Sequence, residues 1–170
     1  TRSLDTGSFI NWNRSLAGYW NFNENSGTTA QDKSTYANHA TLNNGPLWTT
    51  GKFGSALNFD GSNDYVDLPN TTSGMAYTQG TVSAWIRADT IPASGYELIY
   101  SNHGTGVWDD RIYLGLGNNQ IFLRLGTLSN TYLSSISTGA WYHIVLTWGS
   151  GASGTYAVYK DGVSVGTGNY

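Results

Sequence analysis

The sequence contains no cysteine, one methionine and three prolines, and its charged residues are scarce. The absence of cysteine excludes disulfides, thiolate metal sites and a cysteine nucleophile. Only 11% of the residues are charged, against roughly 25% in an average soluble domain, and like charges form no run. We therefore expect no nucleic acid partner. No apolar stretch approaches the roughly 18 residues of a membrane-spanning helix, so we expect no membrane insertion.

The residues that are abundant suit short strands joined by tight turns. Glycine (22), tyrosine (12) and tryptophan (7) are frequent, and 170 residues suffice for one domain with its own core. No window has the sustained apolar spacing of an amphipathic helix. Low charge with many small polar and aromatic residues is typical of adhesive and sugar-binding proteins. We therefore expect an extracellular or cell-surface location.

Segments with strand alternation or strand composition recur at short intervals. They are residues 16–22, 39–42, 56–59, 65–68, 81–87, 111–117, 120–125, 141–148, 156–159 and 163–165. Gly117-Asn118-Asn119 and Lys160-Asp161-Gly162 each separate two such segments and tolerate positive φ, so both predict hairpin turns. The pattern predicts an all-β fold, a two-sheet antiparallel β-sandwich.

Short motifs follow one another in order from residue 16 to about residue 168. They are LAGYWNFNENSGTTA (16–30), DKS (32–34), ANHATL (37–42), GKFGSALNFDG (51–61), DYV (64–66), VSAWI (82–86), WYHIV (141–145) and YKDG (159–162). The series resembles laminin-G-like (LamG) domains of bacterial and archaeal type, in the concanavalin A-like lectin/glucanase superfamily. The resemblance implies a concanavalin A-like jelly roll that serves as a binding scaffold. Many members bind carbohydrate, and many carry calcium.

The resemblance assigns residues 16–170 to the LamG-like domain and leaves residues 1–15 as an N-terminal extension. Family members usually close with a further strand pair that contains an acidic segment, and Tyr170 comes before any such segment. A sandwich without its last strands exposes an open sheet edge. We therefore predict that residues 8–12 pack as an added strand on such an edge, in the same subunit or in a neighbouring one.

A calcium site is predicted in the loop of residues 31–38. Calcium takes oxygens from carboxylates, amides and backbone carbonyls on irregular loops. Asp32 and Asn38 offer such oxygens, and the family resemblance adds weight to Asp32. The alternative, equally well supported, is that Asp32 caps its own turn. His39 is expected to have a structural role, and His143 to be a hydrogen-bonded core residue.

A ligand site is predicted around the loop that enters the segment 111–117. Its tryptophan offers a stacking surface, and its charged residues offer acceptors and donors for hydroxyl groups. Two further side chains point away from the apolar sides of adjacent strands and are predicted to line the same outer face. The predicted ligand-binding residues are His103, Trp108, Asp110, Arg111, Tyr113 and Arg124. In the alternative interpretation, the loop charges form a solvated ion pair and the tryptophan covers a sheet edge.

The carboxylates do not favour catalysis. Glycoside hydrolysis usually needs two carboxylates on one cleft, and neither Glu24 nor Glu97 has an acidic partner two or four residues on. We therefore expect a non-catalytic carbohydrate-binding or adhesion module that binds a glycan or another surface ligand. The alternative is a structural subunit of an extracellular fibre or surface layer that self-associates through open sheet edges. A polysaccharide-degrading enzyme is the least favoured hypothesis.

Overall fold

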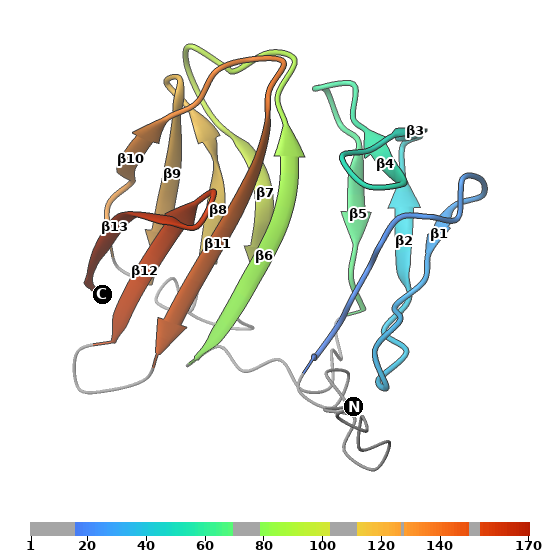
Figure 1. Cartoon of the computed structure of the whole chain (residues 1–170), viewed down its shortest axis with the longest axis horizontal. Coiled ribbons are helices and arrows are strands. Elements are labelled where there is room, and N and C mark those ends of the chain that lie inside the picture. Colours follow the sequence, from blue (N-terminus) through green and yellow to red (C-terminus); the bar gives the residue numbers. More distant parts are fainter. Residues whose placement is uncertain (1–15, 70–78, 103–111, 127, 150–153) are drawn as a thin grey trace, which may run out of the picture. The chain divides into compact units, whose positions relative to one another are not determined.

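The computed structural model describes residues 16–69, 79–102, 112–126, 128–149 and 154–170, and these residues form strands, turns and loops without a helix. Accordingly, no helix among them has the length and apolar character needed to cross a membrane. The chain divides into two compact units, Thr1–Met75 and Ala76–Tyr170, and each is described by itself. Figure 1 labels the strands of both units.

The second unit is a sandwich of two four-stranded antiparallel sheets (Figure 1). One sheet has the order β13-β12-β11-β6, with β6 at Gly80–Arg87, β11 at Trp141–Gly149, β12 at Thr155–Lys160 and β13 at Val163–Asn169. The other has the order β10-β9-β8-β7, with β7 at Glu97–Asn102, β8 at Ile112–Gly117, β9 at Gln120–Leu125 and β10 at Thr131–Ser135. We call the first of these the β6 sheet and the second the β8 sheet.

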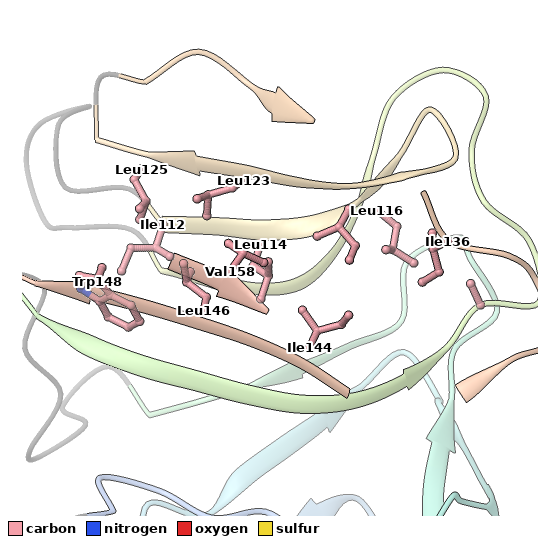
Figure 2. Packing of buried hydrophobic residues seen from close by; sticks show 12 residues of the cluster. Ile112, Leu114, Leu116, Leu123, Leu125, Ile136, Ile144, Leu146, Trp148 and Val158 are labelled. Carbon is pink, nitrogen blue, oxygen red and sulfur yellow. The ribbon is translucent and has the colours of Figure 1, made fainter. Parts of the chain in front are cut away.

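Apolar side chains from the facing sides of both sheets form the core of this unit (Figure 2). Leu114 and Leu123 come from the β8 sheet, Ile144, Leu146 and Val158 come from the β6 sheet, and all five are fully buried. Each side chain of this size contributes about 1.5–3 kcal/mol when it is removed from water. Because alternate residues of a strand point to opposite faces, the residues between them lie on the outer faces of the sandwich.

Both predicted hairpin turns are confirmed. Asn118 and Asn119 have φ angles of 51° and 58° between β8 and β9. Asp161 and Gly162 have φ angles of 51° and 80° between β12 and β13. Two consecutive residues with positive φ give a turn whose twist matches that of the flanking strands.

The first unit contains two small antiparallel sheets. One has the order β1-β2-β5, with β1 at Thr29–Ala30, β2 at Ala40–Asn43 and β5 at Tyr65–Asp67. The other is a hairpin of β3 (Leu47–Thr50) and β4 (Ser55–Asn58). The core of this unit consists of buried Ala30, Ala40 and Leu42, with partly buried Trp20 and Trp48 among the side chains packed on them.

The predicted two-sheet antiparallel sandwich is confirmed. The ends of most predicted strands lie within four residues of the observed strand ends. The strand predicted at residues 16–22 is wrong, because only Trp20 forms a bridge, to Asp32, and Phe22 has a φ of 53° that extended backbone does not adopt. The strand predicted at residues 8–12 lies outside the described residues, as does the proposed extension of residues 1–15.

Candidate functional site

The outer face of the β8 sheet brings two of the predicted ligand residues together. Ile112, Leu114 and Leu116 of β8 are buried in the core, so Tyr113 points to the outer face. The same alternation in β9 turns Arg124 outward, and the strand register places it directly opposite Tyr113. Both side chains are partly buried. The prediction that these two residues share an outer face agrees with this register, and their role in binding stays a prediction.

An aromatic row lies beside this pair on the same face. Phe122 points outward from β9, yet it is only 1% exposed, because the rings of Tyr96 and Tyr132 lie 5.0 and 6.2 Å from its ring centre. The residue opposite Phe122 is Gly115, where an added Cβ would be 2.6 Å from Phe122 Cε1. The absence of a side chain at this position therefore lets the phenylalanine ring lie across β8.

The side chains around Phe122 in this row are exposed to solvent. Tyr96, Leu98 and Tyr132 are 51%, 43% and 42% exposed. Leu98 lies opposite Gly115 in the register of β7 with β8, and Tyr132 lies opposite Phe122 in the register of β9 with β10. The row therefore crosses the sheet, with a buried phenylalanine supporting exposed apolar groups. We call Tyr96, Leu98, Phe122 and Tyr132, with Tyr113 and Arg124, the β8 face.

Arg124 gives this face a cationic hydrogen-bond donor. Its Nε is buried and has no hydrogen-bond partner among the described residues. A guanidinium carries several N–H groups in a planar fork and stays charged at any physiological pH. Because Nε is buried, a ligand on the exposed aromatic row would meet the other N–H groups of this guanidinium, an arrangement suited to a ligand with both an apolar surface and polar oxygens.

Four predicted ligand residues, His103, Trp108, Asp110 and Arg111, lie outside the described residues, and their roles stay predictions. The segment that contains them joins β7, which ends at Asn102, to β8, which begins at Ile112. Sequence reasoning did not identify Tyr96 and Tyr132 as part of a site. The strand that carries Tyr132 was not predicted, so the row was not recognised.

Asp32 is the centre of a hydrogen-bond network in the first unit. It is 5% exposed, and its Oδ1 accepts bonds from the backbone N–H groups of Tyr19 (2.7 Å) and Ser34 (2.8 Å). Its Oδ2 accepts bonds from Ser34 Oγ (2.6 Å) and from the backbone N–H of Asn38 (2.8 Å). Burial alone raises the pKa of this carboxyl, but these four hydrogen bonds outweigh burial and lower the pKa below its usual value.

This arrangement fits the capping alternative for Asp32 better than a calcium site. Four donors already occupy the carboxylate, while calcium requires six to eight oxygen ligands. The side-chain amide of Asn38 donates to the carbonyl of Ala17, and its backbone carbonyl accepts from Trp20 Nε1. The described residues contain no group of three or more acidic, histidine or cysteine side chains placed to hold a metal. Calcium binding at Asp32 and Asn38 stays a prediction.

The two described histidines have hydrogen-bond partners. His39 Nδ1 accepts the backbone N–H of Asp32 at 3.1 Å, in keeping with the expected structural role. His143 shares a hydrogen bond of 2.8 Å with Ser83 Oγ, but it is only partly buried and its ring stacks on exposed Trp85. The prediction that His143 is a core residue is therefore wrong. In β11 the buried residues Ile144, Leu146 and Trp148 alternate with less buried ones, and this alternation turns His143 outward.

Comparisons with known proteins agree on the fold. Neuronal pentraxin-2 from Homo sapiens and from Cavia porcellus is 28% identical over 88 residues, 52% of this chain and 20% of the pentraxin. The chain thus spans about a fifth of the length of these curated relatives. The crystal structure of an S-layer domain-containing protein (residues 221–444) from Clostridium thermocellum ATCC 27405 superposes with a TM-score of 0.54. It is 25% identical, and the match covers 89% of this chain and 71% of that one.

The family is shown by a laminin-G family model, described as "Concanavalin A-like lectin/glucanases superfamily", which matches residues 60–170. This span includes both sheets of the sandwich. The chain belongs to the concanavalin A-like lectin/glucanases superfamily, as a laminin-G-type jelly roll.

Proposed function

We propose that this chain is a non-catalytic carbohydrate-binding module of a secreted or cell-surface protein, and that its glycan lies on the β8 face. The observation that carries the proposal is the exposed aromatic row, supported by Phe122, beside the guanidinium of Arg124. Sugar rings present C–H groups that pack on aromatic faces and hydroxyl groups that accept from charged donors. The β8 face offers both, and all its members except Tyr96 lie on strands that pack on the core.

Two further observations support this proposal. The superfamily takes its name from lectins and glucanases, which favours a carbohydrate ligand. The similar solved structure belongs to an S-layer domain-containing protein, which favours a surface location. Glu24 is paired with Lys33 at 3.4 Å. Such a pairing is not the arrangement of two carboxylates across one cleft that glycoside hydrolysis requires.

The test is affinity electrophoresis of the full chain in gels that contain neutral, acidic or amino-sugar polysaccharides. Tyr96→Ala and Arg124→Ala should each weaken binding at least about tenfold, equal to about 1.4 kcal/mol. The matched control is Tyr65→Ala, because Tyr65 is also 51% exposed but lies in the first unit. Equal retardation of all four proteins, or no retardation of the wild type in any gel, would reject the β8 face as a glycan site.

A second candidate function is a structural subunit of a surface layer or fibre. The observation that favours it is strand β13, an edge of the β6 sheet with seven residues and neither charge nor proline. Val163 on this edge is 67% exposed. Exposed edges usually carry charges, prolines or bulges that prevent pairing with another chain; β13 lacks charges and prolines, and its register with β12 shifts once, between Val158 and Tyr159.

Light scattering coupled to gel filtration tests this second candidate. Self-association that Val163→Lys and Thr167→Lys abolish would support edge pairing, since both side chains lie on exposed positions of β13. A wild type that stays monomeric at high concentration would rule the candidate out for the isolated chain.

A further inference from the structure

The outer face of the β6 sheet carries a second set of aromatic side chains. In β6 the residues Val82, Ala84 and Ile86 are less exposed than Ser83, Trp85 and Arg87, which lie on the outer face. The register with β11 places His143 opposite Trp85 and Trp141 opposite Arg87. On the outer face, the Trp85 ring is therefore paired with the His143 ring, and the Trp141 ring is paired with the Arg87 guanidinium.

The best-defined pair is Trp85 with His143. Their ring centres are 5.1 Å apart and their planes differ by 24°, so the rings are stacked. Ser83 Oγ is 2.8 Å from His143 Nε2 and fixes the imidazole orientation. The backbone N–H of His143 donates to Asp161 Oδ1 at 2.9 Å. Trp85 thus stacks on His143, which is itself fixed by two hydrogen bonds, while 42% of the Trp85 surface stays exposed.

The neighbouring pair adds a polar end to this surface. The Arg87 guanidinium lies 5.7 Å from the ring centre of Trp141, and Arg87 Nε donates to Asp89 Oδ1 at 3.1 Å. Asp89 neutralises Arg87, and the carboxylate of Asp161 lies beside His143, so the surface carries no excess positive charge that would attract phosphate or an acidic polymer. Its donors, acceptors and flat rings instead match an uncharged ligand that is rich in hydroxyl groups.

We propose that Trp85, His143, Ser83 and Arg87 form a second glycan-binding surface, which takes the apolar face of a neutral pyranose ring on Trp85. This surface is independent of the β8 face, because the two lie on the outer sides of two different sheets of one sandwich. One module therefore has two binding surfaces that face away from each other. Such a module cross-links two polysaccharide chains, and the resulting avidity exceeds the affinity of either surface.

A cross-strand aromatic pair also stabilises a sheet by about 0.2–1 kcal/mol without binding anything. The test must therefore separate binding from stability. The full chain is titrated with neutral hexasaccharides of β-1,4-glucose, β-1,3-glucose and N-acetylglucosamine while tryptophan fluorescence is recorded. At least one of these sugars should shift the emission of the wild type, and Trp85→Ala should abolish that shift. Trp85→Phe, which keeps a stacking ring, should retain binding by calorimetry.

Ser83→Ala provides a variant in which the exposed ring remains and only the orientation of His143 is released. It should weaken binding severalfold with little change in Tm. Tyr96→Ala, on the β8 face, should leave the fluorescence shift intact, so failure of the β8 face and failure of this surface are distinguishable. A fluorescence shift that persists unchanged in Trp85→Ala, or no shift with any of the three sugars, overturns the proposal.

Cross-linking has its own readout. Turbidity of a long neutral polysaccharide built from the bound sugar should rise with wild-type protein, and it should not rise with Trp85→Ala. Turbidity that Trp85→Ala raises as strongly as the wild type would contradict a binding role for this surface.

Discussion

Replacing Asp32 tests the hydrogen-bond network that organises the first unit. Asp32→Ala removes the acceptor of four hydrogen bonds, three of which come from backbone N–H groups. A hydrogen bond to a charged group contributes about 1.5–3 kcal/mol, and a buried donor left without a partner costs about 1–3 kcal/mol. Of the donor residues, Asn38 is buried, whereas Tyr19 and Ser34 are reached by water. We therefore expect a loss of about 3–5 kcal/mol rather than the full sum.

The pH dependence of stability distinguishes the charge of Asp32 from its shape. The folded pKa is lowered relative to the unfolded value of about 3.9, so the stabilisation is complete above that value and is lost as the pH falls through the folded pKa. Asp32→Asn keeps the size of the side chain but carries no charge at any pH. The stability difference between wild type and Asp32→Asn should therefore be largest near pH 7 and should shrink below pH 4.

Urea unfolding followed by circular dichroism and by tryptophan fluorescence, at several pH values, measures this difference. Two probes are needed because the two compact units need not unfold together. An Asp32→Asn variant as stable as the wild type at pH 7, or a stability difference that stays constant as the pH falls, would contradict a stabilising role for the Asp32 charge.

Three further predictions concern the core, the β8 face and calcium. Leu146→Ala should lower the free energy of unfolding by about 2–5 kcal/mol because Leu146 is fully buried, whereas Leu47→Ala, at a position 67% exposed, should change it by less than about 0.5 kcal/mol. Gly115→Ala should cost about 1–3 kcal/mol in urea unfolding, because the new Cβ would clash with Phe122 and the Glu97 carbonyl oxygen; a cost near zero would contradict the packing described. Calcium and EDTA should give the same Tm if Asp32 only caps its turn, and a higher Tm in calcium that Asp32→Asn abolishes would instead support the metal site.

The sandwich was predictable because its central strands carry strong local signals. Alternation in β8, β9 and β11, and turn residues with positive φ such as Asn118 and Asp161, each point to the same topology. Strands β7 and β10 were missed, because their short sequences mix polar and apolar residues and their registers shift within the strand. Such strands form because neighbours in the sheet offer hydrogen bonds, and a local pattern does not contain that information.

The candidate site was predicted only in part, for a related reason. The alternation of β8 and β9 is enough to turn Tyr113 and Arg124 to one side. The aromatic row, in contrast, depends on contacts between residues far apart in the chain, such as Tyr96 with Phe122. The stacking of His143 on Trp85 likewise depends on the register of β6 with β11, which the sequence does not specify.

The most direct test of the proposed function is to map a bound glycan on the sandwich. The full chain, labelled with ¹⁵N, is titrated with the polysaccharide fragment that it binds most tightly, and amide shifts are followed by NMR. If the glycan lies on the β8 face, the largest shifts should fall in β8, β9 and β10 around Tyr113, Phe122 and Tyr132, and they should be lost in Arg124→Ala. Shifts confined to the first unit, or a pattern that Arg124→Ala leaves unchanged, would contradict glycan binding on the β8 face.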